Sequence, residues 1–371
     1  MRRLEPLRCL CVLPSFAGGG AERVTLLLAE ALAAQGIASS LVVVDGNGPL
    51  APAVPRSLSV KVLHRRRLRH ALPALAQHIL SERPDILFSS LDYVTAALAG
   101  LLLPFRRRPR LVAREANLPS LAYASAGLSR WMRFAYGRCD LVIASSRRMA
   151  EELRAHYRVC ERRLMLLPNP VDVSALRRHA HAQPSPAPDG LTDDFCVGDA
   201  RCFVASGRLV SQKGFDRLLA CWPHMHPCDR LILLGDGPGR EGLMRQAEAL
   251  GVARRVHFAG FVDNPWAWYA RADAVLLASR FEGMPNVALE ALACGAPVIA
   301  TPESGGIGEL ADEAAPGDVA VVPMGEPYIA AMQAVSVRHA CGPSASRLPS
   351  VHAMEVVAAA LATRLKALAS G

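Results

Sequence analysis

The chain has 371 residues, which is enough for two domains of ordinary size, each with its own core. Apolar residues make up 51% of it, and glycine and proline are frequent without a regular period. This composition excludes a disordered or fibrous protein and favours a globular α/β fold. Ten cysteines without a CxxC pair argue against a zinc site or a disulfide framework and favour a reducing, cytoplasmic setting.

The net charge of +9 is unevenly divided. Residues 1–180 hold 27 lysines and arginines against 13 acidic residues, whereas the remainder holds 15 against 20. Basic clusters lie at Arg65–Arg67 and Arg106–Arg108, each followed by one more arginine. They suit peripheral contact with an anionic membrane, although a solubilising arginine-rich face explains them equally well. We expect no nucleic acid partner, because no recognised binding motif accompanies the charge.

The first predicted strand, Leu7 to Leu13, is too short to act as a signal peptide. A loop with three glycines leads from it into a helix predicted at Ala21 to Gln35. Gly19 and Gly20 allow a phosphate to approach the helix N-terminus and are candidate donor-binding residues. Arg23 replaces the third glycine of a GxGxxG pattern, yet Asp45 would suit a ribose, so dinucleotide binding stays open here.

Further strands of the first half alternate with helices, which predicts a parallel, doubly wound sheet. They are expected at Val60–Leu63, Ile86–Ser89, Leu111–Ala113, Leu141–Ala144 and Leu164–Leu167. Three polar residues follow one of these strands: Arg114, Glu115 and Asn117. They are candidates for the binding of an acceptor substrate. The alternative is that they have a structural role.

The apolar segment Tyr93–Phe105 is followed by three arginines. It predicts either a helix that touches a membrane or, as the favoured alternative, a buried helix of the first domain.

The domain boundary is expected at the Pro-Asn-Pro sequence of residues 168–170, because two prolines force an extended backbone. We therefore predict an N-terminal domain at 1–170, a linker and mobile loop at 171–200, a C-terminal domain at 201–350 and a final helix at 351–371. The Pro- and Ala-rich residues 181–194 would form the mobile loop.

In the second half, a strand at Cys202–Ser206 is followed by Gly207, Arg208 and Lys213. Two fixed cations on such a loop can hold a diphosphate and neutralise its charge as a bond to it breaks. Two further strand-to-loop passages bring Gly237, Phe261 and Val262 to the same edge of the sheet. The loop with Phe261 and Val262 resembles one whose backbone meets a nucleotide base in a known family, unless these side chains belong to the core.

Residues 273–309 form the most informative stretch, a strand, a loop and a helix followed by another strand. Pro285 is expected as the first helical residue and Gly295 as the residue that stops the helix. Glu282 in the loop and Glu290 in the helix both face the ligand end of the strands, unless both are simply solvated. The free N–H groups of the helix start suit a phosphate, and carboxylates suit hydroxyls, so a sugar nucleotide is indicated. The helix-start residues are Gly283, Met284, Pro285 and Asn286.

Four segments carry a resemblance to a known family. E-G-x-P-x-x-x-x-E with A-x-G-x-P-V-I-A-T, the G-R-L-x-x-x-K-G-x-D segment, GGGAERV and P-N-x-V-D resemble retaining glycosyltransferases of family four. The resemblance implies the GT-B architecture, two Rossmann-like doubly wound domains facing a cleft, with the final helix crossing back to the first domain. It also implies that Arg208 and Lys213 bind the diphosphate in place of a metal, that Glu282 positions the sugar and that Glu290 holds the ribose.

The expected reaction moves a sugar, with retention of configuration, from a nucleoside diphosphate to an acceptor hydroxyl. UDP is the expected nucleotide, no metal or other cofactor is expected, and a lipid-linked or surface-polysaccharide glycan is the expected acceptor. Such an acceptor suggests a place on the cytoplasmic face of the inner membrane. A sugar-nucleotide epimerase, a dinucleotide-dependent oxidoreductase and a catalytically degenerate scaffold are the alternatives. The scaffold stays open because the family's first-domain histidine has no counterpart near Asn117.

Overall fold

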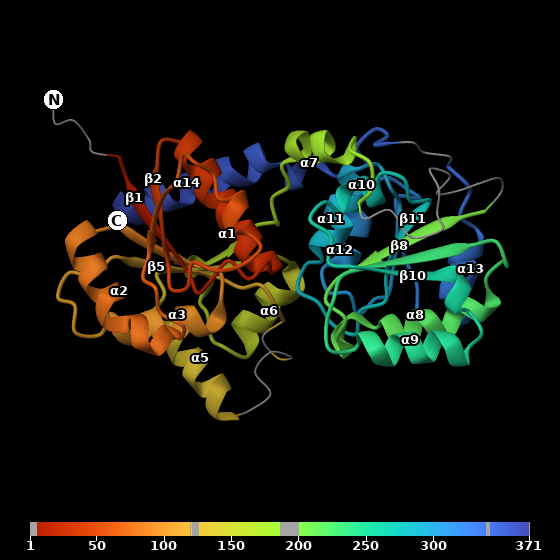
Figure 1. The fold of residues 1–371 in the computed structure, drawn as a ribbon. Helices are drawn as coiled ribbons and strands as arrows, with labels where there is room; N and C mark the ends of the chain where they lie inside the picture. Colours follow the sequence, from red (N-terminus) through yellow and green to blue (C-terminus); the bar gives the residue numbers. More distant parts are fainter. Residues whose placement is uncertain (1–5, 119, 121–125, 186–199, 339–341, 371) are drawn as a thin grey trace. The chain divides into compact units, whose positions relative to one another are not determined.

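The computed structural model describes residues 6–118, 120, 126–185, 200–338 and 342–370 (Figure 1). The chain divides into two compact units, which we call unit 1 (Met1–Pro170 with Met354–Gly371) and unit 2 (Val171–Ala353). Most of the mobile loop that the sequence predicts at 181–194 lies outside the described residues.

The described part of unit 1 contains a seven-stranded parallel sheet with the strand order β3-β2-β1-β4-β5-β6-β7. Its strands are β1 (Arg8–Leu13), β2 (Ala38–Val43), β3 (Ser59–Val62), β4 (Ile86–Ser89), β5 (Arg110–Arg114), β6 (Leu141–Ala144) and β7 (Leu164–Leu166). The inner strands β4 and β6 are buried throughout and coincide with the expected ranges. Helices cover both faces of such a sheet, so its inner strands are continuous apolar runs.

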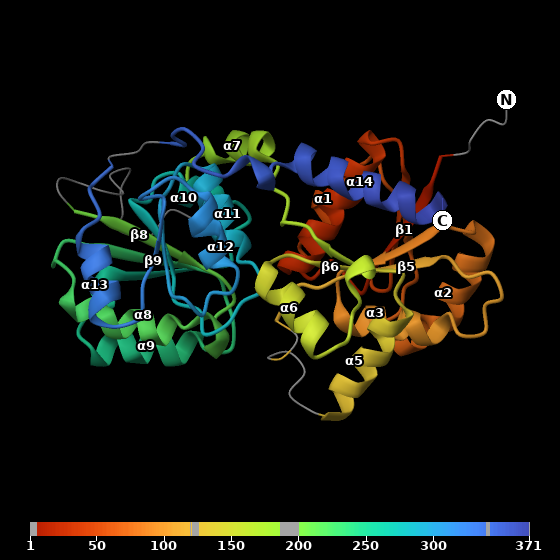
Figure 2. The ribbon, with the colours of Figure 1, turned by 180° about the vertical axis from the view of Figure 1, so that it is seen from behind.

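Helices pack on both faces of this sheet. They are α1 (Gly20–Ala34), α2 (Leu68–Glu82), α3 (Asp92–Leu101), α5 (Ala126–Arg138), α6 (Arg147–Ala155) and α14 (Met354–Ser370). One core contains side chains of α2, α3, α5 and α6, and the other contains those of α1 and α14. Helix α14 lies along α1 in both views (Figures 1 and 2), and Lys366 Nζ donates a hydrogen bond to the carbonyl of Gln35 at 2.9 Å.

Helix α3 accounts for the apolar segment that begins at Tyr93. Val94 and Leu98 are completely buried in the core, as the buried-helix interpretation requires. Tyr93 and Leu103 nevertheless keep 51% and 55% of their surface exposed. No helix in the described ranges is both long and apolar enough to cross a membrane.

The described part of unit 2 contains a six-stranded parallel sheet with the order β10-β9-β8-β11-β12-β13. Its strands are β8 (Cys202–Ser206), β9 (Arg230–Leu234), β10 (Val256–Gly260), β11 (Ala274–Leu277), β12 (Val298–Ala300) and β13 (Val319–Val321). Its helices are α7 (Val173–Ala180), α8 (Phe215–Cys221), α9 (Arg240–Ala249), α10 (Trp266–Tyr269), α11 (Asn286–Ala293), α12 (Ile307–Glu313) and α13 (Glu326–Gln333).

The strand order of unit 2 reverses its direction between β8 and β11, and that of unit 1 reverses between β1 and β4. In open α/β sheets, ligands bind outside the carboxyl ends of the strands at this point of reversal. The loops that follow β8 and β11 are therefore the first place to look for a site in unit 2. These loops carry Lys213 and Glu282.

Candidate functional site

The loops after β8 and β11 are joined by an ion pair. Lys213 Nζ lies 2.5 Å from Glu282 Oε1, and the hydroxyl of Ser279 donates a second hydrogen bond to the same oxygen at 2.9 Å. The side chain of Glu282 is only 10% exposed and that of Lys213 is 22% exposed. A cation and a carboxylate are thus held together at the carboxyl edge of the sheet, with limited access of water.

Two glycines allow the lysine loop to take this path. Gly214 has φ +67°, and a Cβ there would lie 1.9 Å from the carbonyl oxygen of Ala278 at the end of β11. Gly207 has φ +152°, and a Cβ there would lie 3.0 Å from Cε of Lys213. Because neither position has room for a side chain, the two loops approach closely and Lys213 extends across Gly207.

A second contact fixes the two loops to one another. The guanidinium of Arg280 donates two hydrogen bonds to the carboxylate of Asp216, at 2.8 and 2.7 Å. These bonds lower the pKa of Asp216. Gln212 Nε2 donates to the carbonyl of Phe281 at 3.0 Å, and Arg280 N donates to the carbonyl of Gln212 at 2.7 Å. The position of the Lys213–Glu282 pair is therefore set by bonds on both sides of it.

Arg208 differs from Lys213 in its surroundings. Its side chain is exposed, and within the described residues its guanidinium has no hydrogen bond or ion pair. The backbone of its loop is bonded to the next one, since Leu209 N donates to the carbonyl of Asp236 at 3.0 Å and Gly239 N donates to that of Leu209 at 2.9 Å. The turn that contains Gly237 is thus attached to the arginine loop.

Helix α11 starts beside the ion pair. The sequence expectation for Pro285 is wrong by one residue: with φ −75° and ψ 105° its backbone is extended, so it is the N-cap and Asn286 is the first helical residue. Pro285 and Val287 line a small pocket together with Ser206, Lys213 and Ser279. The N-terminal N–H groups of α11 are therefore next to the lysine, in a place that suits a phosphate.

The other residues expected near the helix start contribute in different ways. Gly283 is buried, and its carbonyl accepts a hydrogen bond from Gly306 N at 2.7 Å. The side chain of Met284 packs in the core, so only its backbone can face a ligand. Glu290 is half-buried and its Oε2 accepts a hydrogen bond from Nε1 of Trp266 at 3.0 Å. Trp266 was not expected in the site, and no sequence spacing relates it to Glu290.

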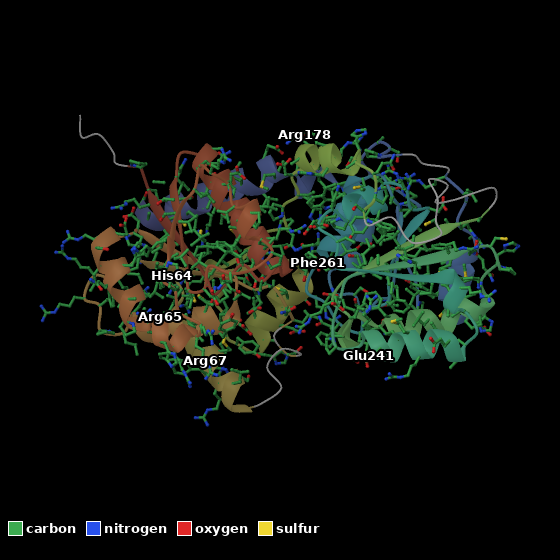
Figure 3. All side chains as sticks on the ribbon, viewed as in Figure 1. His64, Arg65, Arg67, Arg178, Glu241 and Phe261 are labelled. Carbon is green, nitrogen blue, oxygen red and sulfur yellow. The ribbon has the colours of Figure 1, made fainter. Side chains whose placement is uncertain are left out.

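Phe261 and Val262, which follow β10, differ from each other. Val262 is part of the hydrophobic core, as the structural interpretation of this residue requires. The side chain of Phe261 is 58% exposed (Figure 3). An exposed aromatic ring at the carboxyl edge of a sheet offers a flat surface on which a base can stack.

The glycine loop of unit 1 ends in helix α1. Gly20 is its first residue and Gly19 its N-cap, and both are exposed. The carboxylate of Glu22 covers Gly19, since an added Cβ would lie 2.3 Å from Glu22 Oε2. Burial raises the pKa of Glu22. Partial burial of the Tyr93 hydroxyl, and after it the carboxylates of Glu22 and Asp92, raise the pKa of Tyr93 to about 12.

The three acceptor candidates at the end of β5 are placed differently from the expectation. Arg114 is buried and donates to Oδ1 of Asn169. Glu115 is also buried; Oε2 accepts from the hydroxyl of Tyr136, and Oε1 accepts from the backbone N–H groups of Ala116 and Asn117 at 2.9 and 3.3 Å. Of the three, Asn117 alone is exposed. The burial of Arg114 and Glu115 argues for a supporting role rather than contact with an acceptor.

Burial also changes the ionisation of the two buried side chains. It lowers the pKa of Arg114 to about 10, although the neighbouring Glu115 raises it. It raises the pKa of Glu115, against the hydrogen bond from Tyr136, which lowers it. Nε and Nη1 of Arg114 have no hydrogen-bond partner among the described residues.

The described residues form two parallel-sheet α/β units, each with loops at the carboxyl ends of its strands, and comparisons with known proteins identify the family. Residues 200–336 match the family model of glycosyl transferases group 1, and residues 18–175 match that of glycosyltransferase family 4. The chain belongs to this group of GT-B glycosyltransferases of the family-four type.

Three relatives are informative. The N-acetylgalactosaminyltransferase of Campylobacter jejuni that acts on a diphospho-undecaprenol-linked sugar is 25% identical over 56% of this chain and 54% of its own. The lipopolysaccharide core biosynthesis glycosyltransferase LpsE of Rhizobium meliloti is 28% identical over 77% of each chain. The crystal structure of Anabaena HepE in complex with UDP has a TM-score of 0.71 at 19% identity, over 98% of each chain, and establishes the likeness of fold.

Proposed function

We propose that the protein transfers a sugar from a UDP-sugar to a hydroxyl of a lipid-linked glycan, with retention of configuration and without a metal ion. The observation that carries the proposal is the Lys213–Glu282 pair beside the N-terminus of α11. The ammonium group and the helix N–H groups favour a diphosphate, and the carboxylate favours sugar hydroxyls. A diphosphate and a sugar are the two parts of a sugar nucleotide on either side of the bond that breaks.

Lys213 and Arg208 would neutralise the diphosphate as the bond to the sugar breaks. Lys213 is already oriented by Glu282, which reduces the reorganisation needed when the donor binds. Arg208 is exposed and can turn toward a phosphate oxygen. Two protein cations supply the charge that a divalent metal provides in other enzymes, which supports the metal-independent proposal. Among the described residues, no group of three His, Cys, Asp or Glu side chains could hold a metal ion.

Glu282 would contact the donor sugar through its second oxygen. Both of its hydrogen bonds use Oε1, so Oε2 can accept from a sugar hydroxyl. Glu290 would accept from the ribose hydroxyls, and Phe261 would stack on the base. Retention fits a site in which the departing diphosphate itself accepts the proton of the attacking hydroxyl. Such a reaction needs no side-chain nucleophile.

The acceptor and the place of reaction are the least constrained parts of the proposal. The name of the Campylobacter relative contains a polyprenyl diphosphate carrier, and the Rhizobium relative acts in lipopolysaccharide core assembly. Both names support a lipid-linked glycan as the acceptor. A membrane-bound acceptor and a basic unit 1 support a peripheral place on the cytoplasmic face of the inner membrane.

The test is a reaction of the purified protein with UDP-glucose, UDP-galactose and their N-acetylated forms, in the presence of chelator, on short-chain lipid diphosphate sugars. We expect UDP release that depends on the acceptor and a product whose new linkage has the α-configuration of the donor by NMR. A product of inverted configuration, or activity that disappears with chelator, would overturn the mechanism. Acceptor-independent conversion of the donor into another UDP-sugar would indicate an epimerase instead.

A further inference from the structure

Helix α5 exposes an apolar stripe at the surface of unit 1. Leu128, Trp131 and Phe134 are 43%, 46% and 38% exposed, and their spacing of three residues places them along one side of the helix. The rings of Trp131 and Phe134 stack with their centroids 5.1 Å apart. The side of α5 that carries Met132, Ala135 and Tyr136 is buried in the core, so the helix is anchored to unit 1.

The stripe continues onto α3, which lies beside α5 (Figures 1 and 2). A Cβ on Gly100 of α3 would lie 3.8 Å from the ring of Trp131. Leu103, three residues beyond Gly100, is 55% exposed. We call the surface formed by Leu103, Leu128, Trp131 and Phe134 the α5 face. Surface hydrophobic residues are usually scattered singly, so three on one side of α5, together with Leu103 in the turn after α3, mark an interaction surface.

The charge around the α5 face has one sign. From Tyr93 to Cys139 the sequence holds eight arginines and one acidic residue, Glu115, whose carboxylate is buried against Tyr136. Arg108 and Arg110 both pair with the single carboxylate of Asp140, which leaves one net positive charge, and Arg114 is buried. Four others, Arg106, Arg107, Arg130 and Arg133, are exposed. Arg133 is also held in place, because its Nη2 donates to the carbonyl of His156 at 2.8 Å.

We infer that the α5 face docks on an anionic lipid bilayer, with Trp131 and Phe134 in the headgroup region and the exposed arginines on lipid phosphates. Two features commit the surface to lipid. Trp131 has an apolar ring and a polar N–H, which suits the boundary between acyl chains and water. The exposed charges beside the stripe are all positive, which matches anionic headgroups. The inference rests on the proposed function, because it identifies the surface that would bring a lipid-linked acceptor to the enzyme.

The test measures sedimentation of the full-length protein with vesicles of phosphatidylglycerol and phosphatidylcholine in equal parts, at about 0.1 M salt and without donor. We expect binding to these vesicles and weak binding to phosphatidylcholine alone. Replacing Trp131 and Phe134 by serine should lower the partition coefficient by about tenfold or more. Replacing Arg130 and Arg133 by serine should lower it by about fivefold for each arginine and weaken its dependence on salt, since Arg106 and Arg107 remain.

Matched controls come from α9 of unit 2 and the turn that follows it, which also expose apolar and basic residues. Met244 and Leu250 are 40% and 36% exposed, and Arg245 and Arg254 are exposed. Serine at either of these pairs should leave the partition coefficient unchanged. An equal loss in the α9 and α5 variants would overturn the inference, as would full binding by the Trp131 and Phe134 variant or a native protein that stays in the supernatant.

A spectroscopic readout separates docking from unfolding. Trp222 and Trp268 are fully buried and the half-buried Trp266 belongs to unit 2, so Trp131 should dominate a fluorescence change on contact of unit 1 with lipid. Lipids brominated near the headgroup should quench the native protein but not the Trp131→Phe variant, which should still bind vesicles. Equal quenching of both proteins contradicts the inference. UDP binding by the variants, measured without vesicles, reports on the proposed function separately. The α5 face can be unable to bind lipid while the donor site still binds UDP.

Discussion

Lys213 and Glu282 are 69 residues apart in the chain, yet Nζ and Oε1 are 2.5 Å apart in unit 2. The pair connects the loops that follow β8 and β11, the two strands between which the sheet order reverses. One oxygen of the carboxylate orients the lysine, and the other has no hydrogen-bond partner among the described residues. Under the proposed function the pair would couple diphosphate recognition to sugar recognition, and the consequences can be measured.

Lys213→Ala should weaken UDP binding by roughly 10- to 100-fold, because a charge-assisted contact to the diphosphate of about 1.5–3 kcal/mol is lost. Calorimetric titration with UDP gives the dissociation constant, and uridine gives the reference without phosphates. Uridine binding should change little, since Lys213 would contact the phosphates alone.

The control for Lys213→Ala is Arg245→Ala on α9, whose side chain is 71% exposed in the same unit. This substitution removes one positive charge at a position outside the Lys213–Glu282 pair, so it should leave UDP binding unchanged. If Lys213→Ala binds UDP as tightly as the native protein does, the diphosphate does not bind at this lysine.

Glu290→Ala should remove the discrimination between UDP and its 2′,3′-dideoxy analogue. In the native protein the carboxylate would accept from the ribose hydroxyls, so the analogue should bind about tenfold more weakly than UDP. In the variant both ligands should bind with the weaker affinity, as measured by calorimetry. Glu241→Ala, at a side chain that is 88% exposed, is the matched control. Persistent discrimination in Glu290→Ala would place the ribose elsewhere.

Local patterns in the sequence predicted the elements of the fold well, since β4, β6 and β8 have the expected bounds. Apolar runs bounded by turn residues are a local property, so they can be read without knowing the fold. The order of the strands is not local, because any parallel strand can pair with several others. The contact of Lys213 with Glu282 depends on β8 lying next to β11, which the residues alone do not reveal.

The same reasoning explains what was missed. Asp216 ends the G-R-L-x-x-x-K-G-x-D segment, so the motif could have identified it as a site residue. Its partner Arg280 is 64 residues away and follows a different strand, so no local pattern relates the two. Glu115 follows a strand and so seemed available to an acceptor. Its burial depends on Tyr136, which reaches it from α5, and no spacing rule relates a loop residue to a later helix.

The Arg280–Asp216 contact predicts an acid-sensitive site. The folded-state pKa of Asp216 is below its unfolded value of about 3.9, so the folded state binds the proton more weakly. Its stabilising effect is present above pH 4 and is lost as the pH falls through the lowered folded pKa. Asp216→Asn should therefore lower the melting temperature near pH 7 and have a smaller effect near pH 3. Thermal unfolding across that range measures this.

Both side chains of that contact are partly exposed, so the loss of stability in Asp216→Asn should be modest. The larger effect should be on UDP affinity, because the two loops would no longer hold Lys213 and Glu282 in register. If Asp216→Asn lowers the melting temperature by the same amount at pH 3 as at pH 7, the role given to Arg280 is contradicted.

Glu115 and Asn117 separate a supporting role from acceptor contact. Burial raises the folded-state pKa of Glu115, so the folded state holds the proton more tightly than the unfolded chain does. The contribution of Glu115 to the stability of the native protein thus falls as the pH rises through the unfolded value of about 4.3 toward the raised folded value, and the cost of the buried charge persists above it. Glu115→Gln removes that charge and can still accept hydrogen bonds.

Glu115→Gln should therefore melt at the same or a higher temperature than the native protein at pH 7, with an advantage that shrinks below about pH 4. Its KM for the acceptor should be unchanged. Asn117→Ala, at an exposed position two residues away, should raise the acceptor KM without changing UDP binding, because a lost neutral hydrogen bond of about 1 kcal/mol corresponds to about fivefold. A large rise in acceptor KM for Glu115→Gln, with normal stability, would instead make the buried carboxylate part of the acceptor site.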